Sequence, residues 1–319
     1  MKDIIPVFDW HTVMVMPWAE GFGSYGWIMA MGFLVGLTCS LVGVFLVLRQ
    51  ISLVGDAISH SLLPGIALAF LISGARDSQT MLIGAIGAGV LTTVLVELIY
   101  KKSRLKLDAA LGTVFTTLFA IGVIIISIFA DSVDLDAECV LYGEIAFIPL
   151  TDYSNFMGIS APMPVVRLGA VCFILIGLMV AFYKELIVTS FDVGLAKSLG
   201  INVNVFHYGL MIALSVVIVY SFESVGAILV IALLIFPVTT AQLLTDRISV
   251  IFRLCPVLAG LYSVLGLHLA VWLDCSIAGA MAVVAGLIFG LVWFCSPSRG
   301  LIAGFMKRYL RTPASAELS

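Results

Sequence analysis

Charged residues are scarce in this sequence. Of its 319 residues only 11% are Asp, Glu, Lys or Arg, whereas 62% are hydrophobic. A soluble domain has roughly a quarter of its residues charged, because water must meet most of its surface. The shortage excludes an ordinary soluble protein. At about 20 residues for each helical span, the chain has room for about eight or nine spans joined by short loops.

Several motifs for metal binding, catalysis and secretion are missing as well. The six cysteines are scattered and form no C-x-x-C pair, which argues against a structural zinc site or a disulfide framework. There is no G-x-x-x-x-G-K-[ST] loop, the motif that binds the phosphates of ATP. There is also no H-E-x-x-H motif, which argues against an intramembrane metalloenzyme. The N-terminus lacks a basic segment followed directly by an apolar run, so we expect no cleaved signal peptide. We also expect no catalytic site, no permanently bound cofactor and no nucleic-acid partner.

Apolar runs of helical length dominate what remains. They lie at about 27–48, 51–73, 79–100, 109–130, 165–183, 205–220, 225–244, 250–272 and 276–295. We therefore predict an all-α, polytopic bundle with about eight to nine transmembrane helices. The expected parts are an extracytoplasmic or interfacial N-terminal segment (1–26), a membrane domain (27–300) and a cytoplasmic tail (301–319).

The basic residues predict the orientation. With the N-terminus outside and nine crossings, every one of the 16 Lys and Arg residues except Lys2, Arg76 and Arg167 falls in the cytoplasm. Cytoplasmic loops are enriched in Lys and Arg, so we predict an outer N-terminus and a cytoplasmic C-terminus. Residues 131–164 then lie outside, and we expect them to be partly helical and folded onto the mouth of the bundle. Tryptophans in the first 27 residues suggest a segment resting on the outer leaflet.

Asp56 and His60 stand out in the second apolar run. Four positions apart on a helix, they share one face with their Cβ atoms about 5–6 Å apart. Ionisable residues inside a span are costly and usually face a cavity or a partner. A carboxylate and an imidazole are ligand types for Mn²⁺, Fe²⁺ or Zn²⁺, but one chain supplies only two of them. A complete site therefore needs a second subunit. The alternative is an internal Asp–His hydrogen bond that merely holds the bundle together.

Pro64 and Gly65 follow these two residues and predict a helix break at the site. Proline has no N–H, so the carbonyl of His60 loses its helical hydrogen bond. Gly65 would let the backbone bend there. Freed carbonyls inside a membrane are tolerated where they line protein or water. Ser59 and Ser61 are available to support the two candidate ligands.

A short capped helix is predicted on the cytoplasmic side between two later spans. Asp192 suits its N-cap, and Gly200 suits the position just after its C-terminus. Such a helix of about two turns suits docking into a groove on a soluble partner, and a simple surface turn is the alternative. Elsewhere, Glu97 and Lys101 predict a local ion pair, while His268 and Asp274 are weak candidates for a role at the outer mouth.

Five segments give the chain a resemblance to a known family, the permease subunits of bacterial manganese, zinc and iron ABC importers. The resemblance covers nearly the whole chain. One departure is the segment 236–240, where family members usually carry an alanine-rich run beside the proline. The segments are Arg49–Ala67, Leu141–Glu144, Phe191–Gly200, Val225–Pro237 and Ser296–Leu301.

The resemblance implies a multi-pass protein of the bacterial inner membrane that imports a divalent metal ion by alternating access. It implies that Asp56 and His60 line the translocation path, and that the loop with Asp192, Ala196 and Gly200 is the coupling helix seated on an ATPase. The implied partners are a cytoplasmic ATP-binding subunit, a second permease (identical or paralogous) and an extracytoplasmic metal-binding receptor, besides membrane lipid. The alternative is an ion-coupled secondary metal transporter with Asp56 as proton carrier, although we find none of the paired half-sequences usual in such folds.

Overall fold

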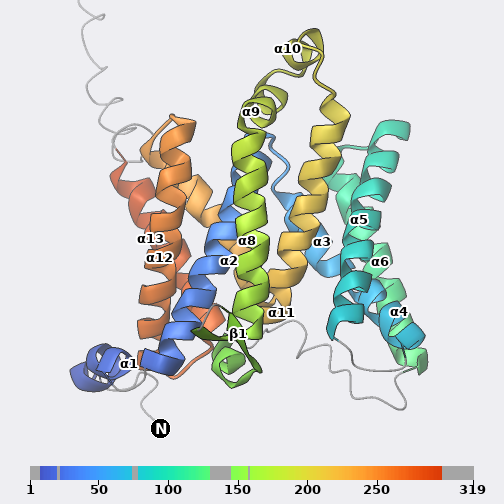
Figure 1. The fold of residues 1–319 in the computed structure, drawn as a ribbon. Coiled ribbons are helices and arrows are strands. Elements are labelled where there is room, and N and C mark those ends of the chain that lie inside the picture. Colours follow the sequence, from blue (N-terminus) through green and yellow to red (C-terminus); the bar gives the residue numbers. More distant parts are fainter. Residues whose placement is uncertain (1–7, 20–21, 74–77, 130–144, 157–158, 297–319) are drawn as a thin grey trace, which may run out of the picture.

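The computed structural model describes residues 8–19, 22–73, 78–129, 145–156 and 159–296 (Figure 1). Within these ranges, eight helical segments are long and apolar enough to cross a membrane, which confirms the predicted polytopic bundle. They are α2 (Phe22–Leu48), α3 (Leu53–Ser61) continued by α4 (Leu63–Ser73), α5 (Ser78–Lys102), α6 (Leu107–Phe129), α8 (Met163–Ala181), α11 (Val203–Leu244), α12 (Ile248–Leu273) and α13 (Ile277–Cys295).

The 42-residue helix α11 contains two of the predicted apolar runs. Its helical geometry breaks at Gly226, which has φ 78° and ψ 168°. A Cβ atom built on Gly55 would lie 2.6 Å from Leu234 Cδ2 and 3.9 Å from Ile218 Cδ1. In a straight helix residues 218 and 234 would be about 24 Å apart, so the chain must turn back at Gly226. The two arms, 203–225 and 227–244, account for the two separate runs.

Helix α11 joins two groups of helices. In the first group, α11 packs against α2 and α13, and α12 packs against both of these helices. In the second group, α11 packs against α3 and α5, and α4 and α6 lie beyond them (Figure 1). Helix α2 supplies much of the core, since Met31, Phe45 and Leu46 are fully buried. On the outer surface of α8, by contrast, Phe173 and Val180 are 80% and 73% exposed. Such apolar exposure on a span is what a lipid-facing surface requires.

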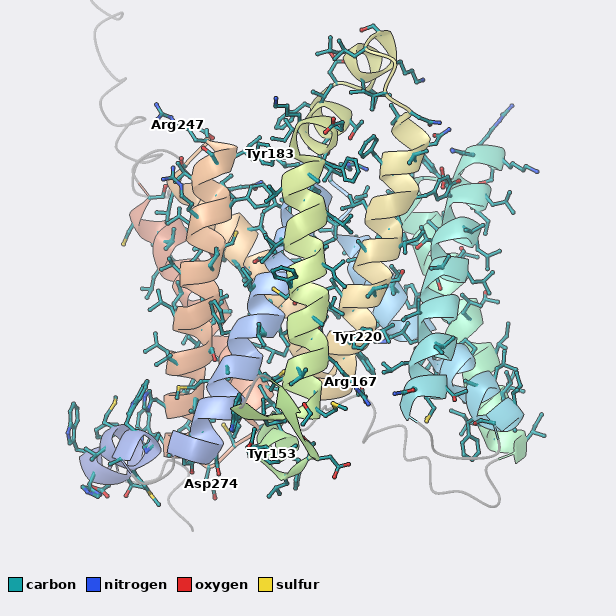
Figure 2. All side chains as sticks on the ribbon, in the orientation of Figure 1. Tyr153, Arg167, Tyr183, Tyr220, Arg247 and Asp274 are labelled. Atoms are coloured by element: carbon teal, nitrogen blue, oxygen red, sulfur yellow. The ribbon has the colours of Figure 1, made fainter. Side chains whose placement is uncertain are left out.

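The connections gather at two opposite ends of the bundle. Figure 2 shows Tyr183 and Arg247 at one end and Tyr153, Arg167 and Asp274 at the other. The first end also carries α9 (Tyr183–Phe191) and α10 (Val193–Ser198), which extend beyond the spans in Figure 1. This separation agrees with the alternating order of spans predicted from the sequence.

The segment between α6 and α8 is more varied than predicted. A 3-10 helix, η3 (Ile145–Leu150), confirms the expectation of partly helical structure. It is followed by an antiparallel hairpin of β1 (Tyr153–Phe156) and β2 (Ile159–Pro162), with Tyr153 opposite Pro162. The amide of Met163 donates to the Asp152 carbonyl at 2.9 Å and closes the hairpin. The all-α prediction overlooked these strands because four residues are too few for a period-two pattern. Residues 141–144 lie outside the described part.

The N-terminal segment packs across the end of α12. It contains a π-helical turn, η1 (His11–Val15), and α1 (Met16–Ala19). Asp9 accepts hydrogen bonds from the Thr12 hydroxyl and from the His11 and Thr12 amides, which lowers the pKa of its carboxyl group. The indole N–H of Trp18 donates to His268 Nε2 at 3.2 Å, and His268 Nδ1 lies 2.8 Å from the Val13 carbonyl oxygen.

These contacts assign a different role to His268 from the one we considered. Because the Trp18 indole can only donate, His268 Nε2 must accept, and Nδ1 must carry the proton that it donates to Val13. Both ring nitrogens are then used to hold the N-terminal segment. His268 therefore packs the N-terminal segment against the end of α12.

Candidate functional site

Helix α3 begins directly after a tight turn. Helix α2 ends at Leu48, and Gln50 in the turn that follows reverses the chain with a φ of 57°. The Ile51 amide donates to the Leu46 carbonyl at 2.9 Å. The Gln50 amide donates to the Val47 carbonyl at 3.1 Å. These two hydrogen bonds form a helix-terminating Schellman motif. The turn therefore fixes where α3 starts and which of its faces meets the bundle.

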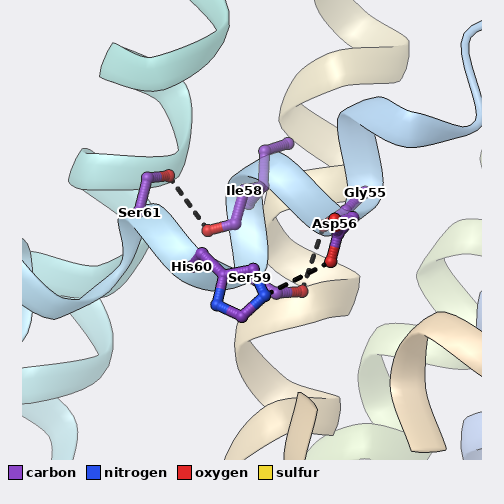
Figure 3. Close-up of polar contacts among 6 residues, drawn as sticks. All are labelled: Gly55, Asp56, Ile58, Ser59, His60 and Ser61. Atoms are coloured by element: carbon purple, nitrogen blue, oxygen red, sulfur yellow. Dashed lines mark hydrogen bonds and ion pairs between the residues drawn. The ribbon is translucent and has the colours of Figure 1, made fainter. Parts of the chain in front are cut away.

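Asp56 and His60 form a half-exposed stripe on α3. His60 Nε2 lies 3.4 Å from Asp56 Oδ1, as Figure 3 shows, and the side chains of His60 and Asp56 are 35% and 40% exposed, respectively. Two ligand atoms about 2.1 Å from a tetrahedral metal ion would lie about 3.4 Å apart. The observed separation is thus suited to a shared metal ion, and it is longer than the roughly 2.7–3.2 Å of an ordinary hydrogen bond.

Helix α6 supports the imidazole from one side. The ring of His60 lies 5.9 Å from the ring of Phe115 and 6.3 Å from that of Phe119, centroid to centroid. These phenylalanines were not among the site residues predicted from the sequence. Their spacing of four positions on a predicted span was the available signal, but nothing in the sequence tied that span to His60.

One chain does not complete a metal site within its described part. There, no group of three or more His, Cys, Asp or Glu side chains is arranged to hold a metal ion. A metal ion bound by Asp56 and His60 would therefore need further ligands from another subunit, from water or from both.

The helix assignment is interrupted at Leu62, near the predicted break, although Leu62 keeps helical backbone angles (φ −70°, ψ −28°), and Gly65 makes a close helix contact. Helix α3 ends at Ser61 and α4 begins at Leu63, so the interruption directly precedes Pro64. A Cβ atom on Gly65 would lie 2.3 Å from the Gly84 carbonyl oxygen, and one on Gly84 would lie 2.4 Å from the Gly65 carbonyl oxygen. Gly65 therefore lets α4 touch α5, a role that the prediction of a bend did not include.

A reciprocal pair of small residues carries this contact. A Cβ atom added to Gly65 would lie 2.6 Å from Ala88 Cβ, and one added to Gly84 would lie 2.6 Å from Ala69 Cβ. Gly65 and Ala69, like Gly84 and Ala88, are four positions apart, which is the small-xxx-small pattern of close helix packing in membranes. The spacing of these small residues in the sequence is the signal that predicts such a contact.

The two serines beside the site do not support the ligands. The Ser59 hydroxyl donates to the Gly55 carbonyl and the Ser61 hydroxyl to the Ile58 carbonyl, each at 3.0 Å; Figure 3 marks both contacts. The Ser61 hydroxyl also lies 2.6 Å from Thr92 Oγ1 of α5. Both serines are buried. They join α3 to its own backbone and to α5, so their predicted role beside the ligands is wrong.

The short helix α10 has both predicted caps. Asp192 Oδ1 accepts a hydrogen bond from the Leu195 amide at 2.9 Å. At the other end Gly200 has φ 75°, its amide donates to Lys197, and the Ile201 amide donates to Ala196. This is a second Schellman motif, and it ends the helix where the sequence predicted.

The exposed surface of α10 is largely apolar. Leu195 of α10 is 50% exposed, and Phe191 at the end of α9 and Leu199 at the C-cap of α10 are each 61% exposed, whereas Ala196 is fully buried. Ala196 therefore packs inward and holds α10 on its own chain. A partner would meet the exposed leucines instead, and such a protruding apolar surface is typical of an interaction site.

The predicted ion pair between Glu97 and Lys101 is present. A third group joins it, because His207 Nε2 of α11 lies 3.8 Å from Glu97 Oε2. The Glu97 side chain is only 13% exposed. These three residues link α5 to α11 near the end of the bundle that carries α10.

Comparisons with known proteins point in one direction. Residues 25–296 match the model of the ABC 3 transport family. The chain is 45% identical over 276 residues to the manganese transport system membrane protein MntD of Bacillus subtilis, covering 86% of this chain and 93% of the relative. It is 45% identical over 275 residues to the zinc transport system membrane protein TroD of Treponema pallidum, covering 86% and 75%. The solved structure of PsaBC from Streptococcus pneumoniae in complex with Fab has a TM-score of 0.76 at 30% identity, covering 93% of this chain and 100% of that one.

Proposed function

Because the chain belongs to the ABC 3 transport family, we propose that it is the membrane permease subunit of an ATP-driven importer of manganese or zinc. The two relatives named for manganese and zinc transport support these metals equally well. Sequence reasoning admits iron too, but neither relative is named for it. The ABC 3 family is one of transport proteins, and we assign ATP hydrolysis to a separate subunit.

The observation that carries the proposal is the Asp56–His60 stripe. Both side chains remain more than a third exposed although they lie in the span Leu53–Ser73. An aspartate that faces lipid costs up to about 2.5–3.5 kcal/mol, the value at the centre of a span, and ionisable residues within spans usually face a cavity or a partner. We therefore expect another structure to cover Asp56, which lies in the first turn of this span. A second permease, identical or paralogous, would do so and would bring its own ligands. Two carboxylates and two imidazoles then make a four-ligand site on the translocation path.

Vesicle uptake tests this function directly. Vesicles containing the complete transporter should accumulate manganese or zinc only when ATP and the ATPase subunit are both present. Uptake that continues without that subunit would support an ion-coupled secondary transporter instead. The receptor that delivers the metal belongs on the opposite side of the membrane from the ATPase.

We place the end that carries α10 in the cytoplasm, because the basic residues gather there. In this orientation α10 is the coupling helix, and its exposed leucines dock on the ATP-binding subunit. Asp192 and Gly200 shape the helix, while the buried Ala196 fixes it to the permease. Residues 297–319, which include the predicted cytoplasmic tail, lie outside the described part.

Charge on the apolar surface of α10 should prevent docking. We expect Leu199→Glu to lower co-purification of the ATPase subunit by at least about tenfold, since an uncompensated charge buried in the interface typically costs about 3–5 kcal/mol. The matched control is Leu105→Glu, which changes a leucine 46% exposed in another turn at the same end. Equal recovery of the ATPase with both variants would show that α10 is not the docking helix.

The N-terminal segment forms a separate contact with the membrane surface in this proposal. Phe8, Trp10 and Trp18 are 43%, 65% and 45% exposed on a segment held against the end of α12. Exposed aromatic rings at the end of a span are typical of the interface between lipid headgroups and chains. We therefore place this segment on the outer leaflet.

Brominated lipids test that placement, because bromine quenches nearby tryptophan. The signal of Trp10 is the fluorescence of the wild-type protein minus that of Trp10→Phe. In nanodiscs we expect this difference to be quenched strongly when bromine lies near the headgroups, and weakly when it lies at the chain ends. A Trp10 signal that ignores both lipids would place the segment in water or against protein.

A further inference from the structure

Arg49 connects the turn before α3 to the end of α9. Its Nε donates to Ser190 Oγ at 3.0 Å, and its Nη2 donates to Thr189 Oγ1 at 3.1 Å. The two hydroxyl protons are already used, because both Thr189 and Ser190 donate to the Leu186 carbonyl, at 3.1 Å and 2.6 Å. Each hydroxyl oxygen therefore faces Arg49 as an acceptor. The guanidinium group thus holds two neighbouring side chains at once.

Each end of this connection leads to a candidate functional element. On one side, Ser190 lies just before Asp192, the N-cap of α10, and α9 and α10 are in direct contact. On the other side, Arg49 lies in the turn that opens α3, the helix of Asp56 and His60. The path from the exposed α10 to the candidate metal site passes through two hydrogen bonds.

The turn that contains Arg49 is well suited to pass on a displacement. Gln50 adopts the left-handed conformation at φ 57°, which is unfavourable for a residue with a side chain. Two backbone hydrogen bonds, from Gln50 and Ile51 back to α2, fix the shape of the turn. A fixed turn moves with the group that holds it, so movement of α9 acts on the first turn of α3.

We infer that Arg49 is a positioning residue that couples movement of α9 and α10 to the Asp56–His60 site. The inference rests on the proposed function, because it takes α10 as the helix that the ATPase moves. Arg49 does not touch the metal in this account. It sets the position of α3 during each ATP cycle.

The test separates coupling from folding and from metal binding. Arg49→Met keeps the apolar stem and removes the donors, whereas Thr189→Val with Ser190→Ala removes the acceptors and keeps their size. Each variant is reconstituted in proteoliposomes with its ATPase subunit, and both ATP hydrolysis and metal uptake are measured. Hydrogen bonds to a charged group are strong enough that we expect metal transported per ATP to fall at least about tenfold in either variant, with ATP hydrolysis continuing.

The combined variant sharpens the result. If the guanidinium acts through these hydroxyls, replacing all three residues should lower the amount of metal transported per ATP no further than Arg49→Met alone does. Arg49→Lys should restore part of the metal transported per ATP. The control is Arg253→Met, because Arg253 Nε donates to the Ser249 carbonyl of its own helix. An unchanged ratio in both variants, or losses that add, would overturn the inference. If Leu199→Glu still blocks ATPase docking in that case, the proposed function survives and only the role of Arg49 fails.

Discussion

Replacing Asp56 or His60 with alanine is expected to lower the rate of metal uptake by at least about a hundredfold. Loss of a group that only supports a ligand typically costs about 10–100-fold in metal affinity, so loss of a ligand itself should cost about that or more. The two residues share one stripe, with His60 Nε2 3.4 Å from Asp56 Oδ1. Removing either one therefore leaves a lone ligand on each such subunit. The measurement is ATP-dependent uptake of radiolabelled manganese and zinc by proteoliposomes.

Two controls make that result specific. His11→Ala removes an exposed histidine outside the spans and should leave uptake unchanged. Asp56→Asn keeps an oxygen ligand but loses the charge, so its uptake should fall between the wild-type and alanine values. Wild-type uptake by both alanine variants would contradict the ligand assignment. Co-purification of the ATPase subunit checks that each variant remains assembled.

Gly84→Ala is expected to destabilise the protein by about 3 kcal/mol, the upper part of the range of about 1–3 kcal/mol for an overpacked core. The added Cβ atom would lie 2.4 Å from the Gly65 carbonyl oxygen, and a backbone atom cannot rotate away. Helices α4 and α5 would have to separate next to the helix break that follows His60. Reversible unfolding in mixed detergent micelles measures the change in the free energy of unfolding.

The matched control lies on the same helix. Gly87 has no atom within 4 Å of an added Cβ, so Gly87→Ala should be neutral or should stabilise the helix by up to about 1 kcal/mol. Equal destabilisation by the two substitutions would show that α5 requires glycine for its backbone and not for the contact with α4. Equal stability of both would show that the two helices do not touch as described.

Patterns within one helix could be predicted from the sequence. The apolar runs located the spans to within a few residues, because lipid imposes both their length and their composition. The caps of α10 followed from Asp192 and Gly200, since each acts on its own backbone. The i, i+4 spacing likewise sufficed to place Asp56 beside His60, because the geometry of a helix is the same wherever it lies.

Contacts between distant segments could not be predicted in the same way. Gly65 was assigned to a bend because glycine serves both bending and close packing, and only the neighbouring Gly84 distinguishes the two. The contact of Arg49 with α9 joins residues 140 positions or more apart, and no local pattern announces it. The reversal at Gly226 was legible as two apolar runs, and these runs form the two helical arms that meet at Gly226.

The central claim is that a transported metal ion binds directly to Asp56 and His60 between two permease subunits. Manganese is paramagnetic, so electron spin echo envelope modulation reports the imidazole nitrogen bound to it. For the complete wild-type transporter loaded with Mn²⁺, we predict a nitrogen modulation. This modulation should become shallower in the His60→Ala transporter, and it should vanish in that variant if the second permease is an identical copy. A modulation of equal depth in the wild-type and His60→Ala transporters would contradict the account.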